Sequence, residues 1–306
     1  MSHTQVTDGN QFDKRQAIGW IGVGKMGGPM ARNLLASGAK LLVSDPAKDN
    51  REQLASMGAY AATTISDFSG AHIVFSTLPN DQALLDVVGD GEGAGLATTL
   101  VAGATLVEMS TVSPECSESV AKALSANKIN YVRAPLSGST DMAASAALTV
   151  LASGDRAGWD EALPHIRKLS ARQFFLGSGE EARYMKLVLN TLVGASSAVL
   201  SEALAIGASG GLTRADMMDV ICESAVASPL FKYKQKPVVE DDFTPAFTVS
   251  QMIKDFTLIS EAARRNSVPL MTASLILELY RSAANAGMRD EDFFALVRWQ
   301  EKLSTR

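Results

Sequence analysis

Cysteine and histidine are scarce in this chain, and their scarcity excludes several kinds of site. The two cysteines, Cys116 and Cys222, lie far apart in the sequence, which argues against a disulfide framework and favours a reducing compartment. The three histidines, His3, His72 and His165, have no cysteine or carboxylate partner at metal-ligand spacing. We therefore expect no metal site.

The chain also lacks the charge pattern and the hydrophobic runs that mark other classes of protein. Its net charge is −5 without a basic cluster, so nucleic-acid binding is not expected. No apolar signal region follows the N-terminus, and no apolar run reaches the ~18 unbroken residues of a membrane span. A P-loop and a G-x-S-x-G elbow are absent as well. With 46% hydrophobic residues, the sequence predicts a soluble, cytoplasmic protein.

The most informative motif is a glycine-rich turn near the start of the chain. Residues 17–23 form a short apolar run typical of a buried parallel strand, and a helix is predicted over 26–37. The glycines between them have the G-x-G-x-x-G spacing of a dinucleotide site, and a second strand over 41–44 ends at an acid, Asp45. The predicted cofactor-binding residues of the turn are Gly22, Val23, Gly24, Lys25, Met26 and Gly27.

Each part of this motif has a physical role. Gly22 permits a tight turn, Gly24 lets a pyrophosphate approach the backbone, and Gly27 lets helix and strand pack closely. Asp45 would accept hydrogen bonds from the adenosine ribose and would repel a 2′-phosphate, which favours NAD over NADP. NADP stays open as the alternative, because Lys48 could reach a phosphate.

Strand-like and helical patterns alternate along residues 17–178. Apolar runs that resemble strands recur at 72–78, 105–109, 129–133, 148–152 and 173–176. This alternation predicts an α/β domain with a Rossmann-type, doubly wound parallel sheet. Residues 1–16 are polar, and we expect them to form a disordered tail.

Ligands bind such sheets at the carboxyl ends of the strands, so residues at strand ends are candidates for the site. Leu78 and Pro79 follow one predicted strand, and Ser110 and Thr111 follow another. The loop after residue 133 contains Ser137, Gly138 and Ser139 and could present amides and hydroxyls to a small anion, although a plain surface loop is an equally good interpretation.

A long helix leads into a second domain, predicted to be all-helical, over residues 179–306. No proline interrupts residues 186–206, which are apolar almost all round, so we predict a core helix shared by both domains. Further helical patterns follow at 249–265, 270–286 and 291–303.

Lys186 lies near the start of this long helix. The helix dipole and burial would both lower its pKa, and Asn190 lies on the same face one turn later. Such a lysine can move protons near neutral pH; the alternative is a lysine whose amine reaches solvent from a buried stem. Since no other motif offers an acid or a base, Lys186 is the general acid/base candidate.

The order of these motifs resembles the β-hydroxyacid dehydrogenase family, which includes 3-hydroxyisobutyrate dehydrogenase and tartronate semialdehyde reductase. The resemblance covers nearly all of the chain after residue 16. It rests on the glycine-rich stretch 22–34, Leu78-Pro79, Ser110-Thr111, Ala134-Pro135-Leu136-Ser137-Gly138, Lys186 with Asn190, and Lys254-Asp255.

The resemblance implies an oxidoreductase that transfers a hydride between a nicotinamide cofactor and a small 3-hydroxy acid or its semialdehyde. Lys186 matches the family's catalytic lysine, Asn190 matches an asparagine beside it, and Lys254 matches a lysine that reaches the cofactor. Ser110-Thr111 matches the step beside the nicotinamide, with Thr111 as the cofactor contact. The serine-glycine loop, Ser137, Gly138 and Ser139, is expected to bind the substrate carboxylate, and the helical domain to form a homodimer or homotetramer.

Three residues depart from the family pattern near the expected substrate pocket. Arg133 stands where an acid is usual, Ser139 replaces a second glycine, and Leu189 replaces the first of two asparagines. The substrate and the physiological direction therefore stay open. Two other functions also stay open: a reductase of imines or sulfonated aldehydes, and a non-catalytic scaffold that binds NAD(P).

Overall fold

The computed structural model describes residues 17–90 and 93–304, which form two compact units divided between Arg183 and Tyr184. The expected disordered tail, residues 1–16, lies outside the described residues. The division falls inside helix α8 (Glu181–Ser209), which begins in unit 1 and continues into unit 2. The domain boundary expected after residue 178 stays a prediction.

Unit 1 is built on a sheet in which the strands follow the order β3-β2-β1-β4-β5-β6-β8-β7, with β9 paired to β8. The strands are β1 Ile18–Ile21, β2 Leu41–Ser44, β3 Tyr60–Ala61, β4 Ile73–Ser76, β5 Thr105–Glu108, β6 Asn130–Arg133, β7 Leu136–Ser137, β8 Leu148–Gly154 and β9 Ser170–Phe175. All pairs from β3 to β6 are parallel. The chain fills one side of β1 first and then the other, so the order reverses between β1 and β4, where such sheets bind ligands.

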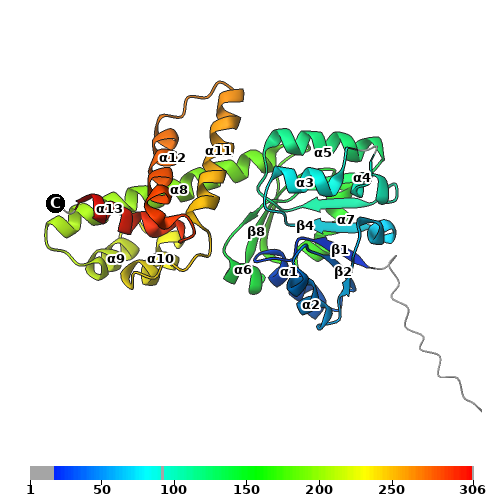
Figure 1. Ribbon diagram of the computed structural model, residues 1–306, viewed down its shortest axis with the longest axis horizontal. Helices are drawn as coiled ribbons and strands as arrows, with labels where there is room; N and C mark the ends of the chain where they lie inside the picture. Colours follow the sequence, from blue (N-terminus) through cyan, green and yellow to red (C-terminus); the bar gives the residue numbers. More distant parts are fainter. Residues whose placement is uncertain (1–16, 91–92, 305–306) are drawn as a thin grey trace, which may run out of the picture. The chain divides into compact units, whose positions relative to one another are not determined.

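Helices cover both faces of this sheet (Figure 1). Trp20 and Phe75 point to one face, where they pack with Met30 and Trp159. On this face lie α1 Gly27–Ala36, α2 Lys48–Ala55, α6 Thr140–Ala144 and α7 Arg156–Ile166; on the other lie the 3-10 helix η2 Ile65–Gly70, α3 Asp81–Val88, α4 Leu96–Thr99 and α5 Pro114–Ala126. Because both faces are buried, the central strands β1, β2 and β4 are almost entirely apolar, and the predicted doubly wound α/β fold is confirmed.

The sheet departs from a fully parallel arrangement after β6. Strand β8 runs antiparallel to β6 and to β7. Parallel neighbours need a crossover of about a dozen residues or more. The segment between β7 and β8 holds only the short helix α6, so these two strands pair antiparallel. The sequence indicated a plain loop here, because neither the two-residue β7 nor α6 is long enough to show a periodic pattern.

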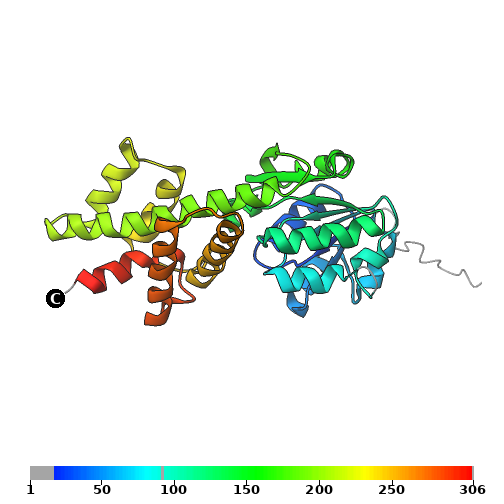
Figure 2. The ribbon, with the colours of Figure 1, turned by 90° about the horizontal axis from the view of Figure 1, so that it is seen from above.

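Unit 2 is helical, as predicted. Besides α8 it contains α9 Arg214–Glu223, α10 Pro229–Val239, α11 Val249–Arg265, α12 Met271–Ala283, the π-turn η3 Ala284–Met288, the 3-10 helix η4 Phe293–Ala295 and α13 Leu296–Ser304. Figure 2 shows α9 and α10 on one side of α8, with α11 and α12 on the other. Helix α10 was missed by the sequence analysis, because Pro237 lies inside it and breaks the helical pattern.

Helix α8 is the core helix of unit 2. Leu187, Ala198, Leu200 and Leu204 are buried against the surrounding helices. A Cβ atom added to Gly194 would lie 2.2 Å from a ring carbon of Phe256, so the glycine that interrupts the helical pattern is required for close packing on α11. By length and composition alone α8 could cross a membrane. A helix of this composition can instead be a core helix, and α8 buries one side in the core of unit 2.

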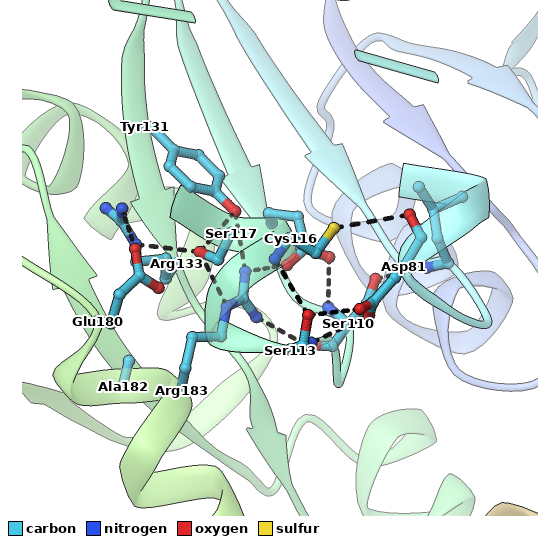
Figure 3. Close-up of polar contacts among 12 residues, drawn as sticks. Asp81, Ser110, Ser113, Cys116, Ser117, Tyr131, Arg133, Glu180, Ala182 and Arg183 are labelled. Carbon is cyan, nitrogen blue, oxygen red and sulfur yellow. Dashed lines mark hydrogen bonds and ion pairs between the residues drawn. The ribbon is translucent and has the colours of Figure 1, made fainter. Parts of the chain in front are cut away.

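A buried polar cluster lies where α8 begins in unit 1 (Figure 3). We call it the Arg183 cluster; it consists of Glu108, Ser110, Ser117, Tyr131, Arg133, Glu180 and Arg183. Arg183 forms an ion pair with Glu108, and the exposed fractions of the two side chains are 1% and 0%. Arg133 forms a second pair with Glu180 and lies 4.5 Å from the ring centroid of Tyr131.

Burial and pairing set the charges of this cluster. Burial by itself would lower the pKa of Arg183, but Glu108 and Tyr131 outweigh it, so the guanidinium stays charged. Burial raises the pKa of Tyr131 to about 12, so its hydroxyl stays neutral and accepts a hydrogen bond from Arg183 Nη2 at 3.0 Å. Removing one partner of a buried ion pair costs on the order of 3–5 kcal/mol, because the other charge is left buried alone.

Candidate functional site

The glycine-rich turn lies between β1 and α1, at the carboxyl end of the central strand. Gly22 has φ +84°, a left-handed conformation that favours glycine. A Cβ atom at Gly27 would lie 2.0 Å from the carbonyl oxygen of Gly22, so helix and turn pack as closely as the sequence predicted.

Thr77 holds this turn in place and was missed by the sequence analysis. Its hydroxyl donates to the carbonyl oxygen of Gly22 and accepts a hydrogen bond from the indole nitrogen of Trp20 at 3.0 Å. Its position directly after β4, beside the reversal of strand order, was the signal that could have identified it.

The turn leaves open space beside Gly24. A Cβ atom at Gly24 would meet nothing within 4 Å, and Lys25 beside it is exposed, so the backbone at Gly24 borders open space. Helix α1 begins three residues later. The amide of its second residue, Gly28, donates to the carbonyl oxygen of Gly24 at 2.8 Å and Pro29 has no N–H, so the amides of the turn before Gly28 are the donors suited to bind a phosphate. The residues predicted to hold the pyrophosphate therefore fit that group.

Asp45 lies at the end of β2, as the sequence predicted, and its carboxylate accepts hydrogen bonds from three protein donors. These are the amide nitrogens of Val23, at 2.8 Å, and Ala47, at 2.9 Å, and the side-chain nitrogen of Asn50, at 3.1 Å. A carboxylate has about four acceptor positions, which leaves room for one further donor such as a ribose hydroxyl. The bond to Val23 also joins the acid directly to the glycine-rich turn.

The candidates at the next two strand ends, Leu78 after β4 and Ser110 after β5, are in direct contact. The amide nitrogen of Leu78 donates to the hydroxyl of Ser110 at 2.6 Å. Pro79 is exposed and Thr111 is half-buried beside them. The structure therefore brings together two segments predicted to contact the cofactor, of which the one after β5 is expected beside the nicotinamide.

The serine-glycine loop runs from β7 into α6. Gly138 has φ +142°, and Ser137 and Ser139 are half-buried on either side of it. Ser139 caps α6: its hydroxyl oxygen accepts from the amide nitrogen of Met142 at 3.3 Å. This replacement of the family's second glycine therefore has a local structural role, and the O–H group of Ser139 can still donate.

In unit 2, helices α8 and α11 bring together Lys186, Asn190, Lys254 and Asp255. The side-chain amide of Asn190 donates to Asp255, which is fully buried, and the ammonium of Lys254 lies 3.1 Å from the same carboxylate. Burial lowers the pKa of Lys186; the carboxylate of Asp255 opposes this lowering, and Lys254 adds to it. The direction agrees with the lowering predicted from burial; the neighbouring charge of Lys254, rather than the helix dipole, adds to it. No role was predicted for Asp255, whose carboxylate contacts both Asn190 and Lys254.

Arg133, one of the departures from the family pattern, belongs to the Arg183 cluster. Its Nε atom donates to Ser117 at 3.2 Å and to Glu180 at 2.7 Å. The charge is thus balanced inside unit 1 by Glu180, an acid supplied from the segment before α8.

The fold and the glycine-rich turn define a dinucleotide-binding protein. Residues 17–177 match the family described as the NAD-binding domain of 6-phosphogluconate dehydrogenase, and residues 178–300 match the NAD-binding domain of NADP-dependent 3-hydroxyisobutyrate dehydrogenase. The chain belongs to the β-hydroxyacid dehydrogenase family, and its cofactor is NAD or NADP.

Several proteins of known name are similar over almost the whole chain. The 2-(hydroxymethyl)glutarate dehydrogenase of Eubacterium barkeri is 30% identical, over 96% of this chain and 97% of its own length. Glyoxylate/succinic semialdehyde reductase 1 of Arabidopsis thaliana is 29% identical, over 92% and 96%. Among solved structures, 3-hydroxyisobutyrate dehydrogenase from Salmonella typhimurium is 28% identical, with a TM-score of 0.83, over 92% of this chain and 99% of that one.

The glycine-rich turn allows cofactor binding to be separated from folding. We expect Gly24→Ala to keep the melting temperature of the wild type, because the added methyl group meets no protein atom. It should nevertheless weaken NADH binding about tenfold or more, because the methyl group occupies the space of the pyrophosphate. Differential scanning fluorimetry and NADH fluorescence titration measure the two effects.

Gly27→Ala is the matched comparison. Its methyl group would overlap the carbonyl oxygen of Gly22, so this variant should lose about 1–3 kcal/mol of stability. Unchanged NADH affinity in a folded Gly24→Ala variant would contradict the predicted position of the pyrophosphate.

Proposed function

We propose that this enzyme oxidises a small 3-hydroxy acid, or reduces the matching semialdehyde, with Lys186 as general acid and base. The observation that carries the proposal is the half-buried Lys186, with its lowered pKa, beside Asn190 and Asp255. The names of the similar proteins support the substrate class, because they are a hydroxy-acid dehydrogenase and a semialdehyde reductase.

Lys186 would hold the proton that moves in the reaction. In oxidation, its neutral amine accepts the proton of the substrate hydroxyl; in reduction, its ammonium returns a proton to the carbonyl oxygen. A lowered pKa favours the first role, because more of the amine is neutral near physiological pH. The nicotinamide, when bound, accepts or supplies the hydride.

Asn190 and Asp255 would orient the groups around the lysine. A carboxylate is only an acceptor, so the bond to Asp255 fixes which end of the Asn190 amide is the nitrogen. The amide oxygen of Asn190 is then the acceptor available to a substrate hydroxyl or to an ammonium. Asp255 also attracts the ammonium of Lys254, the lysine proposed to reach the cofactor.

We assign the substrate carboxylate to the serine-glycine loop of unit 1. Two half-buried hydroxyl groups, of Ser137 and Ser139, flank Gly138, and the cap formed by Ser139 uses the oxygen of that residue as an acceptor. The O–H groups and the backbone amides of such a loop are suited to bind a small anion.

The role of Lys186 can be tested by substitution and by pH. With NAD and a panel of small 3-hydroxy acids, Lys186→Ala should lower kcat about 10²–10⁴-fold. Lys186→Arg should lower kcat by a similar factor, because a guanidinium does not release its proton. In the wild type, kcat/KM for oxidation should rise with pH through an apparent pKa below the ordinary lysine value, and reduction should fall with pH through the same pKa.

The exposed Lys232, changed to alanine, is the control and should keep wild-type activity. Turnover by Lys186→Ala at the wild-type rate would overturn the assignment of this lysine. If the wild type binds cofactor but turns over no hydroxy acid, aldehydes and imines tested in the reducing direction become the next substrates.

We propose that NAD is preferred over NADP, because Asp45 places a negative charge beside the predicted ribose position. Asp45→Asn should weaken NAD binding about tenfold, since one charged acceptor is lost, and should raise the NADP:NAD ratio of kcat/KM by a similar factor. Asp49→Asn, an exposed acid in the first turn of α2, is the matched control. A wild-type preference for NADP would contradict the proposal.

We propose that the enzyme is a cytoplasmic homo-oligomer that associates through unit 2. Val188, Leu192, Val199 and Ile206 recur at helical spacing along α8, and each is at least half-exposed. A stripe of this kind on a soluble protein favours a partner, and a second copy is the partner that the family resemblance implies.

Light scattering coupled to size exclusion tests this association. The wild type should elute as a dimer or tetramer, and the double variant Leu192→Glu/Ile206→Glu as a monomer. Met57→Glu, which places a charge on an exposed apolar residue of unit 1, should leave the assembly intact. A monomeric wild type would exclude the proposed oligomer.

A further inference from the structure

The amide, the carbonyl oxygen and the hydroxyl of Ser110 each have a hydrogen-bond partner. Its amide nitrogen donates to Glu108 Oε1 at 2.7 Å, and its carbonyl oxygen accepts from Arg183 Nη1 at 2.8 Å. Its hydroxyl accepts from the amide nitrogen of Leu78 at 2.6 Å. One buried ion pair, Arg183–Glu108, therefore fixes the segment after β5 and, through Ser110, the segment after β4.

We propose that Arg183 and Glu108 are positioning residues for hydride transfer, which hold the segment after β5, expected beside the nicotinamide, and through it the cofactor-contacting segment after β4. This inference rests on the function proposed above. Neither residue touches the reacting atoms in this proposal; both act through the backbone of Ser110, next to the cofactor contact expected at Thr111.

Arg183 also belongs to the helix that carries the proposed acid/base. Lys186 follows it by one turn of α8. The start of the helix is fixed within unit 1 by a further bond, in which the amide nitrogen of Ala182 donates to the hydroxyl of Ser153 at 3.1 Å. That hydroxyl donates in turn to the carbonyl oxygen of Gly179 at 2.8 Å. A substitution of Arg183 therefore affects the position of the loop after β5 and of the first turn of α8, just before Lys186.

A positioning role explains why the cluster is ionic. A buried ion pair is weak evidence for stability, because well-packed apolar side chains of similar volume often stabilise as much or more. An apolar pair, however, cannot bind both the amide and the carbonyl group of Ser110. The guanidinium donates to the carbonyl oxygen and the carboxylate accepts from the amide, since one is a fixed fork of donors and the other only accepts.

The same cluster contains a matched control. The Arg133–Glu180 pair is almost as buried, and Arg133 shares Ser117 with Arg183. Its hydrogen bonds run to Ser117 and Glu180 rather than to the segments after β4 and β5. Comparing the two pairs separates the positioning of Ser110 from general stability of the cluster.

The experiment replaces each pair by apolar side chains without changing the net charge. In Glu108→Leu/Arg183→Met we expect a folded enzyme with kcat lowered about 10-fold to 10²-fold, as a small misplacement of reacting groups produces. The pKa in the pH profile of kcat should be unchanged, because no net charge is lost. In Arg133→Met/Glu180→Leu we expect kcat within about twofold of the wild type.

Binding of two ligands reports on the nicotinamide end directly. ADP-ribose contains the adenosine and pyrophosphate but no nicotinamide, so its Kd should be the same in all variants within about twofold. The Kd of NADH should rise in Glu108→Leu/Arg183→Met only, so that in this variant NADH no longer binds more tightly than ADP-ribose. If this variant fails to fold, Arg183→Lys, which keeps the charge but loses the fork, should show the same loss of kcat with a near wild-type melting temperature.

Either of two results would overturn the inference: wild-type kcat and NADH affinity in Glu108→Leu/Arg183→Met, or an equal loss of kcat in the Arg133/Glu180 control. Lys186→Ala is measured in parallel. If the wild type turns over a hydroxy acid and Lys186→Ala does not, the proposed function stands whether or not the positioning role does.

Discussion

The ion pair between Arg183 and Glu108 connects three parts of unit 1 that are far apart in the sequence. It joins the end of β5 to the first turn of α8, and through Ser110 it reaches the end of β4. Both charges are taken out of water, so each depends on the other; Arg183 also donates to the hydroxyl of Tyr131, and Glu108 also accepts from the amide nitrogen of Ser110. The segment beside the predicted nicotinamide position is thus fixed by groups that cannot shift independently, which suits a reaction that requires close alignment.

Two different physical means prepare the proposed chemistry. In unit 1 the backbone forms the proposed cofactor site. Gly22 and Gly27 allow strand, turn and helix to approach closely, and Gly24 leaves space for a charged ligand. In unit 2 a side chain is tuned by its surroundings, since burial lowers the pKa of Lys186 while Asp255 limits the change. The glycine-rich turn thus depends on the absence of side chains, whereas the pKa of Lys186 depends on the many side chains that pack around it.

The departures from the family pattern have separate explanations. Arg133 is neutralised by Glu180 within the Arg183 cluster, and Ser139 caps α6. Arg133 and Glu180 lie 47 positions apart in the sequence, so their pairing became visible only in the fold. Nothing in the structure explains Leu189 in place of an asparagine.

The sequence by itself determined the doubly wound sheet, the glycine-rich turn and the helical unit 2, because each depends on local spacing: apolar runs, glycines at fixed intervals and helical periodicity. It also identified Lys186, Asn190 and Asp45 as candidates, since each lies at a fixed offset from such a pattern. Only the tertiary structure decided the antiparallel β8, the support of Gly22 by Thr77, the link from Asn190 to Asp255, and the Arg183 cluster. These features join residues from about 20 to 75 positions apart, and no local pattern records which buried donor will meet which acceptor once the sheet and helices have packed.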